Sequence, residues 1–168
     1  MLALASSSCG YALAGRGSFL PSDIQVVAIP QLENLSTFFN VEQVLTEKIT
    51  AEFIGRGQYR VVTEPVGADA ALNGTVTGIT VSPIGFTEQQ LASRYLFTMT
   101  MRVAFNDLRT NTVLWSNDAL VFRGEYELAT RGNQQLQGDS FLDQERSSFD
   151  RIATDAARSV VTAILEAF

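Results

Sequence analysis

The sequence predicts an α+β fold, a two-layer sandwich in which two helices pack on a mainly antiparallel or mixed sheet of about four to five strands. Residues 94–108 alternate apolar and polar side chains, which is typical of an amphipathic strand. From Asp143 to the C-terminus the apolar residues form one helical stripe. The order strand, helix, several strands, helix fits two layers. We expect one domain over residues 23–168, preceded by a leader over residues 1–22.

The first half of this domain is predicted to contain a strand, a helix and a second strand. Residues 23–30 are a β-branched run bounded by prolines, which indicates a strand. Residues 40–55 carry apolar side chains at helical spacing. We expect the Asn40 side chain to cap this helix and Glu42 to favour its N-terminal dipole. Residues 59–63 are the next β-branched run.

The second half is predicted to form long antiparallel strands. Residues 71–83 contain Gly74 and Gly78 among β-branched residues, which indicates a bulge or a change of buried face. Residues 94–108 turn into residues 113–116, a strand that continues or restarts near residues 119–126, so this pair predicts a hairpin.

Two polar segments are predicted to be surface loops. They lie around residues 82–93 and over residues 127–140, where no sustained period is present. Adaptable polar loops suit contact with a partner, but they are equally typical of inert surface, and both interpretations stay open.

The composition excludes several classes of function. The chain has 168 residues, a net charge of −6 and no histidine. Nucleic-acid binding needs a basic face, so this charge argues against DNA or RNA as a ligand. Without histidine, most catalytic triads and transition-metal sites are excluded. We therefore expect a protein that is not an enzyme and has no metal and no cofactor.

The only cysteine, Cys9, follows a short apolar stretch that ends in three serines. This arrangement is typical of the end of a signal peptide and a lipobox, where the thiol is lipidated with acyl chains such as palmitate. No basic residue precedes Cys9, so we expect that the true signal peptide starts further upstream. The alternative is a frayed N-terminus with an incidental thiol.

Several short blocks together resemble the lipopolysaccharide-assembly LptE family. The opening Cys9-Gly10-Tyr11 is followed by an apolar-glycine step, and the strand ending at Pro30 leads into Leu32-Glu33-Asn34. Further matching blocks occur in the same order along the chain: Leu45-Thr46, Glu52-Phe53, residues 68–74, Asp107-Leu108 and Val113-Leu114-Trp115. Each block is short, and it is their order and spacing that carry the resemblance.

The resemblance implies a lipoprotein anchored at the periplasmic face of the outer membrane. Members of the family plug the lumen of the LptD β-barrel, assist its assembly and contact lipopolysaccharide. This implies an LptD-like partner and a chain that is monomeric when alone. The residues that could contact lipopolysaccharide are Arg94, Arg102, Arg123 and Arg131, although solvated surface charges explain them equally well.

Other functions remain as alternatives. Similar strand-loop-helix openings occur in curli-type secretion-channel lipoproteins, which form rings, and in activators of wall synthases, which dock on an enzyme. A ring-forming protein should be oligomeric alone, whereas a plug should be monomeric until it meets its barrel. A hydrolase would need two converging carboxylates, and the spacing of the acids proposes no such pair.

Four further residues have both a structural and a functional interpretation. Asn34 is expected to bind its own loop backbone rather than a ligand. Asp69 and Asp107 are expected at a strand entry and a hairpin turn rather than in catalysis. Trp115 is expected to pack in the core with other strand aromatics rather than to form a ligand surface.

Overall fold

The computed structural model describes residues 20–56, 59–86, 88, 92–127 and 138–168, with side chains in the last range described from residue 147 onward. In chain order the elements are β1 (Val26–Ala28), β2 (Glu33–Asn34), α1 (Val41–Gly55), β3 (Arg60–Val62), β4 (Ala70–Phe86), β5 (Ala92–Asp107), β6 (Thr112–Glu127) and α2 (Gly138–Leu165). The predicted α+β class is confirmed.

The strands form one mixed sheet with the order β3-β1-β4-β5-β6, and β2 also pairs with β4. The short strand β1 pairs in parallel with β3 and β4, and the short strand β2 pairs in parallel with β4. The long strands β4, β5 and β6 form two antiparallel hairpins. The described sheet has six strands, one more than the upper expectation. The extra strand is β2, whose two residues are too short to show a period in the sequence.

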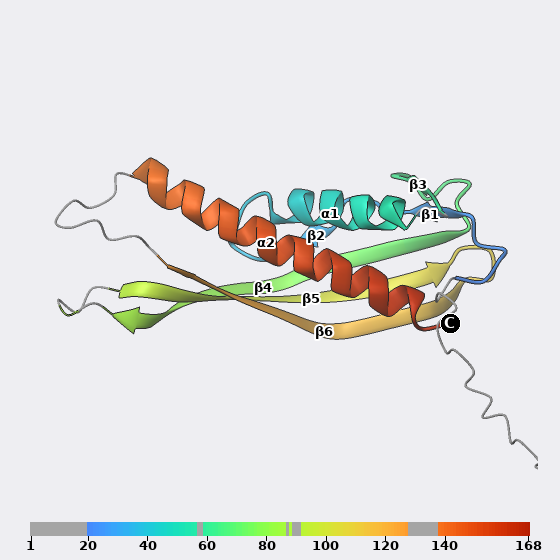
Figure 1. Ribbon diagram of the computed structural model, residues 1–168. Coiled ribbons are helices and arrows are strands. Elements are labelled where there is room, and N and C mark those ends of the chain that lie inside the picture. The colour runs from blue at the N-terminus through green and yellow to red at the C-terminus, as the bar shows by residue number, and fades with distance from the viewer. Residues whose placement is uncertain (1–19, 57–58, 87, 89–91, 128–137) are drawn as a thin grey trace, which may run out of the picture.

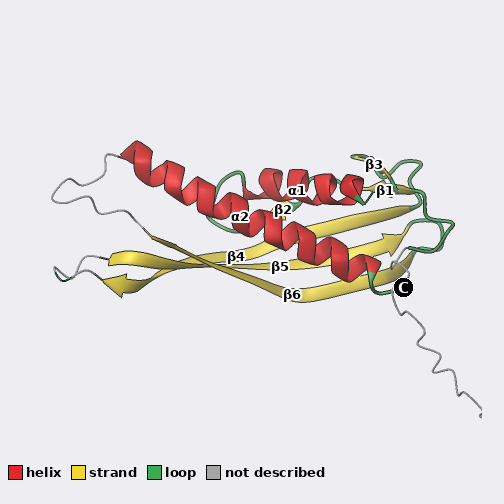
Figure 2. Ribbon diagram, in the orientation of Figure 1, coloured by secondary structure: helices red, strands yellow, loops and turns green. Residues whose placement is uncertain are grey.

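Both helices lie on the same face of the sheet, as Figure 2 shows by colour. In Figure 1, α1 covers only part of the sheet, and the β4–β5 hairpin extends well beyond it. The helix α2 crosses the long strands diagonally. The other face of the sheet is therefore not covered by any described helix.

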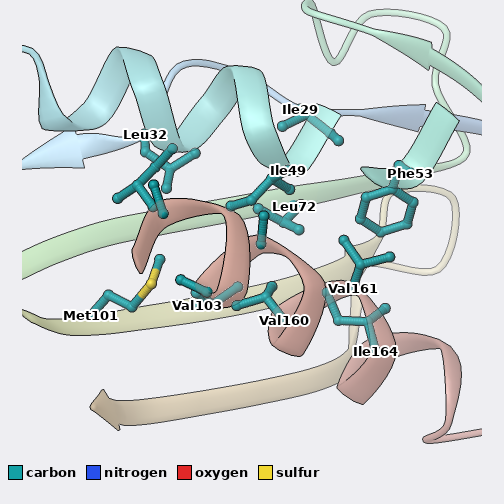
Figure 3. Packing of buried hydrophobic residues seen from close by; sticks show 14 of the residues in the cluster. Ile29, Leu32, Ile49, Phe53, Leu72, Met101, Val103, Val160, Val161 and Ile164 are labelled. Carbon is teal, nitrogen blue, oxygen red and sulfur yellow. The ribbon is translucent and has the colours of Figure 1, made fainter. Parts of the chain in front are cut away.

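The core lies between the helices and this sheet (Figure 3). Ile49 and Phe53 of α1 and Ile164 of α2 are fully buried there. They meet the apolar face of β5, where Phe105 stacks on Phe53 with ring centroids 6.3 Å apart. Alternate residues of β5 enter the core because successive side chains of a strand point to opposite faces. The amphipathic strand predicted for this segment is confirmed.

The prediction that the Asn40 side chain caps α1 is wrong. Asn40 precedes the helix in the left-handed region, with φ 62°, and its side chain makes no capping hydrogen bond. A capping side chain normally reaches the first helical N–H groups from an extended backbone. With the backbone of Asn40 left-handed, only its carbonyl takes part, accepting from Val44 N–H at 3.2 Å.

The expected bulge near Gly78 is confirmed, because the pairing of β4 with β5 shifts between Val76 and Gly78. The loop expected around residues 82–93 is mostly strand, since β4 runs to Phe86 and β5 starts at Ala92. The long C-terminal helix starts at Gly138 rather than near Asp143. The rest of the polar loop expected after residue 127 lies outside the described residues.

A candidate partner-binding face

The face of the sheet opposite the helices is called the open face here. On β5 it carries the residues that alternate with the buried Phe97, Met99 and Met101. Its members are mostly hydroxyl and charged side chains from three strands: Thr80, Ser82, Thr98, Thr100, Arg102, Arg123 and Glu125. Five of these are exposed and two, Thr98 and Thr100, are half-buried. The open face also carries Leu96 and Val121, but it is mainly polar and offers many groups that both donate and accept hydrogen bonds.

Three of the four arginines expected near a ligand lie on the open face. Arg123 is opposite Thr98, midway between Arg94 and Arg102 along the neighbouring strand. At a rise of about 3.3 Å per residue, each interval of four residues is roughly 13 Å. The three cations therefore form a widely spaced line rather than a cluster. Arg131 lies outside the described residues, as does Cys9.

Acidic residues interrupt this line at one end. Glu127 is the cross-strand neighbour of Arg94, and Glu125 lies opposite Leu96. These glutamates and Arg94 also line a hollow of about 440 Å³ together with Arg151. The charges in this hollow are balanced, so Arg94 is a weaker anion-binding candidate than Arg102 or Arg123.

Arg102 and Arg123 have no carboxylate partner in the described part of the chain. The ion pairs found there join Lys48 to Asp150, Arg56 to Glu52, and Arg109 to two aspartates. Arg102 lies beside Thr75 of β4, and Arg123 beside Thr98 of β5. Both cations are exposed, so they are available to an anionic group on a partner or ligand.

Asp107 and Asp69 belong to a structural cluster around Arg109. Arg109 donates to Asp107 at 2.9 Å and to Asp23 at 2.6 Å. The carboxylate of Asp107 also accepts the N–H groups of Arg109 and Thr110, which closes the turn between β5 and β6. The hydrogen bond from the Arg109 side chain lowers the pKa of Asp107 to about 2. The expected turn role of Asp107 is confirmed.

Asp69 anchors the start of β1. Its Oδ2 accepts the N–H groups of Gln25 at 2.9 Å and Val26 at 2.8 Å. These two backbone hydrogen bonds lower the pKa of the Asp69 carboxyl below its usual range. The sequence did not predict the ion pair between Asp23 and Arg109, because these residues are 86 positions apart and no local motif joins them. Within the described residues, no group of acids or cysteines is arranged to hold a metal ion.

Asn34 organises the loop before α1. Its amide donates to the carbonyl of Phe38 at 2.7 Å and to Glu42 at 2.8 Å, and its Oδ1 accepts the N–H of Ser36 at 2.9 Å. The expected backbone role of Asn34 is confirmed. Trp115 is half-buried and packs against the core, as expected.

Residues 24–164 match the family model LptE, described as lipopolysaccharide-assembly. The chain belongs to the LptE family. The resemblance carried by the short sequence blocks is thereby confirmed, and the family assigns the chain to lipopolysaccharide assembly. A search of curated proteins finds no significant match.

Solved structures share the fold of this LptE-family chain at low sequence identity. Rare lipoprotein B from Shewanella oneidensis has 10% identity and a TM-score of 0.56 over 83% of this chain and 93% of that one. Lipoprotein B from Nitrosomonas europaea has 16% identity and a TM-score of 0.53 over 94% and 88%. PelC from Paraburkholderia phytofirmans, a dodecamer, has 14% identity and a TM-score of 0.53 over 88% and 93%.

None of the described helices is long and apolar enough to cross a membrane.

Proposed function

We propose that this LptE-family chain is a lipid-anchored outer-membrane protein that plugs an LptD-like β-barrel and assists lipopolysaccharide assembly. Acylation of Cys9 would hold it at the periplasmic face. The observation that carries the proposal is the family match over residues 24–164. The proposed role is binding and needs no chemical step by this chain.

The open face supports this role through its chemistry. The lumen of a transmembrane barrel is polar, because lumen-facing and lipid-facing side chains alternate along each strand. Thr80, Ser82 and the neighbouring hydroxyl groups can exchange hydrogen bonds with such a wall. Removing such a face from water costs little free energy when the partner offers matching hydrogen-bonding groups.

Lipopolysaccharide contact is part of the same proposal. Its phosphate groups would be met by Arg102 and Arg123, which have no carboxylate partner among the described residues. Arginine suits phosphate because its planar guanidinium can form two parallel hydrogen bonds. Arg94, beside Glu127, would contribute at the end of the molecule that carries the β4–β5 hairpin. Arg131 is proposed as a further contact.

The test is recovery of the tagged full-length protein from detergent-solubilised outer membrane, with mass spectrometry of retained proteins and of the N-terminal peptide. We expect an LptD-like barrel at a ratio of about one to one and an acylated Cys9. Recovery of a wall synthase or a ring of this chain without a barrel would contradict the proposal.

Two charge-reversal variants test whether binding depends on the arginines of the open face or only on the net charge of the protein. Arg102→Asp and Arg123→Asp should lower the recovered barrel and lipopolysaccharide, because they place an acid where an anion is expected. Arg158→Asp is the matched control, since Arg158 is exposed on α2, away from the open face. Equal losses in all three forms would show that net charge, and not this face, controls binding.

A ring-forming envelope module is the second candidate, because the fold is shared with PelC, whose structure is a dodecamer. Light scattering of the purified chain separates this candidate from the plug. A ring would have many times the mass of one chain, and a plug would not.

A further inference from the structure

A hollow of about 560 Å³ lies at the edge of the sheet where β1 and β3 begin. One wall is made by residues 20–22 and 24–26, which lead into β1, and the other by Tyr59 and Arg60 at the start of β3. Because β3 is the last strand of the described sheet on this side, no described strand covers the hollow there. In Figure 1, residue 20 and the C-terminus lie at one end of the molecule and the β4–β5 hairpin at the other.

Hydrogen bonds and a buried ring hold the two walls together. The hydroxyl oxygen of Tyr59 accepts the N–H of Leu20 at 3.0 Å, and the N–H of Arg60 donates to the carbonyl of Gln25 at 2.9 Å. The ring of Tyr59 meets the buried ring of Phe53 edge-on, with centroids 6.3 Å apart. The walls are therefore tied to each other and to the core.

The lining of this hollow carries a net positive charge. Arg60 is its only charged residue, and this exposed guanidinium forms no ion pair with any other described residue. Two acids near this segment are engaged elsewhere. Asp23 accepts from Arg109 at 2.6 Å, and Asp69 accepts two backbone N–H groups at the start of β1. Arg60 is thus available to an anionic group that enters the hollow.

The uncharged polar groups of the lining favour a phosphate as that anion. The hydroxyls of Ser22 and Tyr59 and the amide of Gln25 can all donate hydrogen bonds beside Arg60. Phosphate oxygens accept hydrogen bonds, and a guanidinium can bind two of them in parallel.

The hollow beside Arg94 is less suited to a phosphate. Its lining includes Glu125 and Glu127, whose carboxylates would repel an anion. The hollow at Arg60 has no acid in its lining. Of these two hollows, the one at Arg60 is therefore the better phosphate site.

A short stretch of chain joins this hollow to the proposed lipid anchor. Residues 10–19 separate Cys9 from Leu20. A fully extended chain spans at most about 40 Å from one of these residues to the other. Acyl chains on Cys9 would hold the hollow within this distance of the membrane, and such a tether raises the effective concentration of headgroups to about the millimolar range. Lipid headgroups are then the phosphates closest at hand.

We propose that this hollow binds the phosphate of a phospholipid headgroup in the leaflet that carries the anchor, with Arg60 as the anion-binding residue. One acyl chain gives only weak membrane binding, so a second contact strengthens the attachment. The hollow lies at the end away from the β4–β5 hairpin, so headgroup binding leaves the hairpin free for a partner. The choice of a lipid rests on the proposed acylation of Cys9, whereas the hollow and its charge do not.

The test is vesicle binding by the purified full-length chain with one synthetic acyl chain coupled to the thiol of Cys9, the only cysteine. The vesicles contain phosphatidylethanolamine and phosphatidylglycerol. Arg60→Gln should lower the partition coefficient about fivefold, the effect of losing one cation at an anionic membrane surface. Arg151→Gln is the matched control, because it removes the same charge from an exposed position of α2 outside this hollow.

A second variant, Ser22→Glu, places a carboxylate in the hollow and leaves Arg60 in place. It should lower the partition coefficient at least as much as Arg60→Gln, because the new acid repels the phosphate. Ser159→Glu, at an exposed position of α2, is its control. Circular dichroism checks that each variant is folded. Losses in the two variants of the hollow, with both controls unchanged, would support the proposal.

A titration followed by NMR separates a lipid headgroup from free phosphate. Short-chain phosphatidylglycerol, kept below its micelle concentration, should shift the backbone amide signals of Gln25 and Arg60 at lower concentration than inorganic phosphate does. The reason is that Pro21 and Val26, in the same lining, can contact the apolar part of the lipid. An equal response to both would overturn the proposal in favour of a free-phosphate site.

Equal losses of vesicle binding in Arg60→Gln and Arg151→Gln, or no loss in Arg60→Gln, would also overturn the proposal. The acyl chain is attached chemically and no barrel is present in these experiments. Their outcome is therefore independent of whether cells acylate Cys9 and of whether a barrel is recovered with the chain.

Discussion

Arg109, in the turn between β5 and β6, donates a 2.6 Å hydrogen bond to Asp23, which lies 86 residues earlier in the chain. The same guanidinium binds Asp107, and the carbonyl of Asp69 accepts the N–H of Leu108 beside it. The start of β1 and the β5–β6 turn are thereby joined at one end of the sheet. These acids are part of the architecture, which explains why they do not form a reactive carboxylate pair.

Stability should fall in acid because of this cluster. Arg109 holds the pKa of Asp107 at about 2, below its ordinary value of 3.8, and backbone N–H groups lower the pKa of Asp69. A carboxylate with a lowered pKa in the folded state stabilises the fold above its unfolded pKa, and this contribution is lost as pH falls from about 4 to about 2. Urea unfolding of the wild type and Asp107→Asn over this range measures the effect.

At neutral pH Asp107→Asn should be less stable than the wild type, and the difference should shrink below pH of about 4. Asp118→Asn, at an exposed position of β6, is the control and should follow the wild type at every pH. A difference between wild type and Asp107→Asn that stays constant down to acid pH would contradict the assignment.

Gly124 is expected to be sensitive to added volume. A Cβ at this position would lie 2.5 Å from Cδ1 and 2.6 Å from Cγ1 of Ile152 on α2. Ile152 is buried and packed in the core, so Gly124→Ala should destabilise the fold by about 1–3 kcal/mol. Gly78→Ala is the control, because nothing lies within 4 Å of its Cβ.

Urea unfolding would measure both glycine variants. Adding Ile152→Val to Gly124→Ala should lower the free energy of unfolding by less than the two single changes together, because valine lacks the Cδ1 atom that makes the shorter of the two contacts. Full additivity of the two losses would show that this contact does not set the distance between β6 and α2.

The sequence predicts features that depend on local periodicity and fails where distant segments meet. Alternation placed Arg102 on the polar face of its strand, and the structure agrees. It could not show that Glu127 lies beside Arg94, because that requires the register between β5 and β6. The cap at Asn40 failed for a different reason: residue type favours a cap, but the backbone is left-handed there.

Asn34 should contribute to stability through the loop that it organises. Asn34→Ala removes the hydrogen bonds to Phe38, Glu42 and Ser36 and should lower the free energy of unfolding by about 1–2 kcal/mol. Asn73→Ala is the matched control at an exposed position of β4. Equal effects of the two changes, measured by urea unfolding, would mean that the Asn34 network is replaced by water at no cost.

Phe53 should be the most sensitive apolar position of α1. It is fully buried, stacks on Phe105 and meets the edge of Tyr59 at a centroid distance of 6.3 Å. Phe53→Ala should cost about 3–5 kcal/mol, because it removes buried area and leaves a cavity between the helix and the sheet. The next residue, Ile54, is 57% exposed and is the matched control, with an expected change within about 0.5 kcal/mol for Ile54→Ala. Small domains are stable by only about 5–15 kcal/mol, so Phe53→Leu is measured as well, to keep a folded variant in the series. If Phe53→Ala lowered the free energy of unfolding no more than Ile54→Ala, the packing described for this layer would be contradicted.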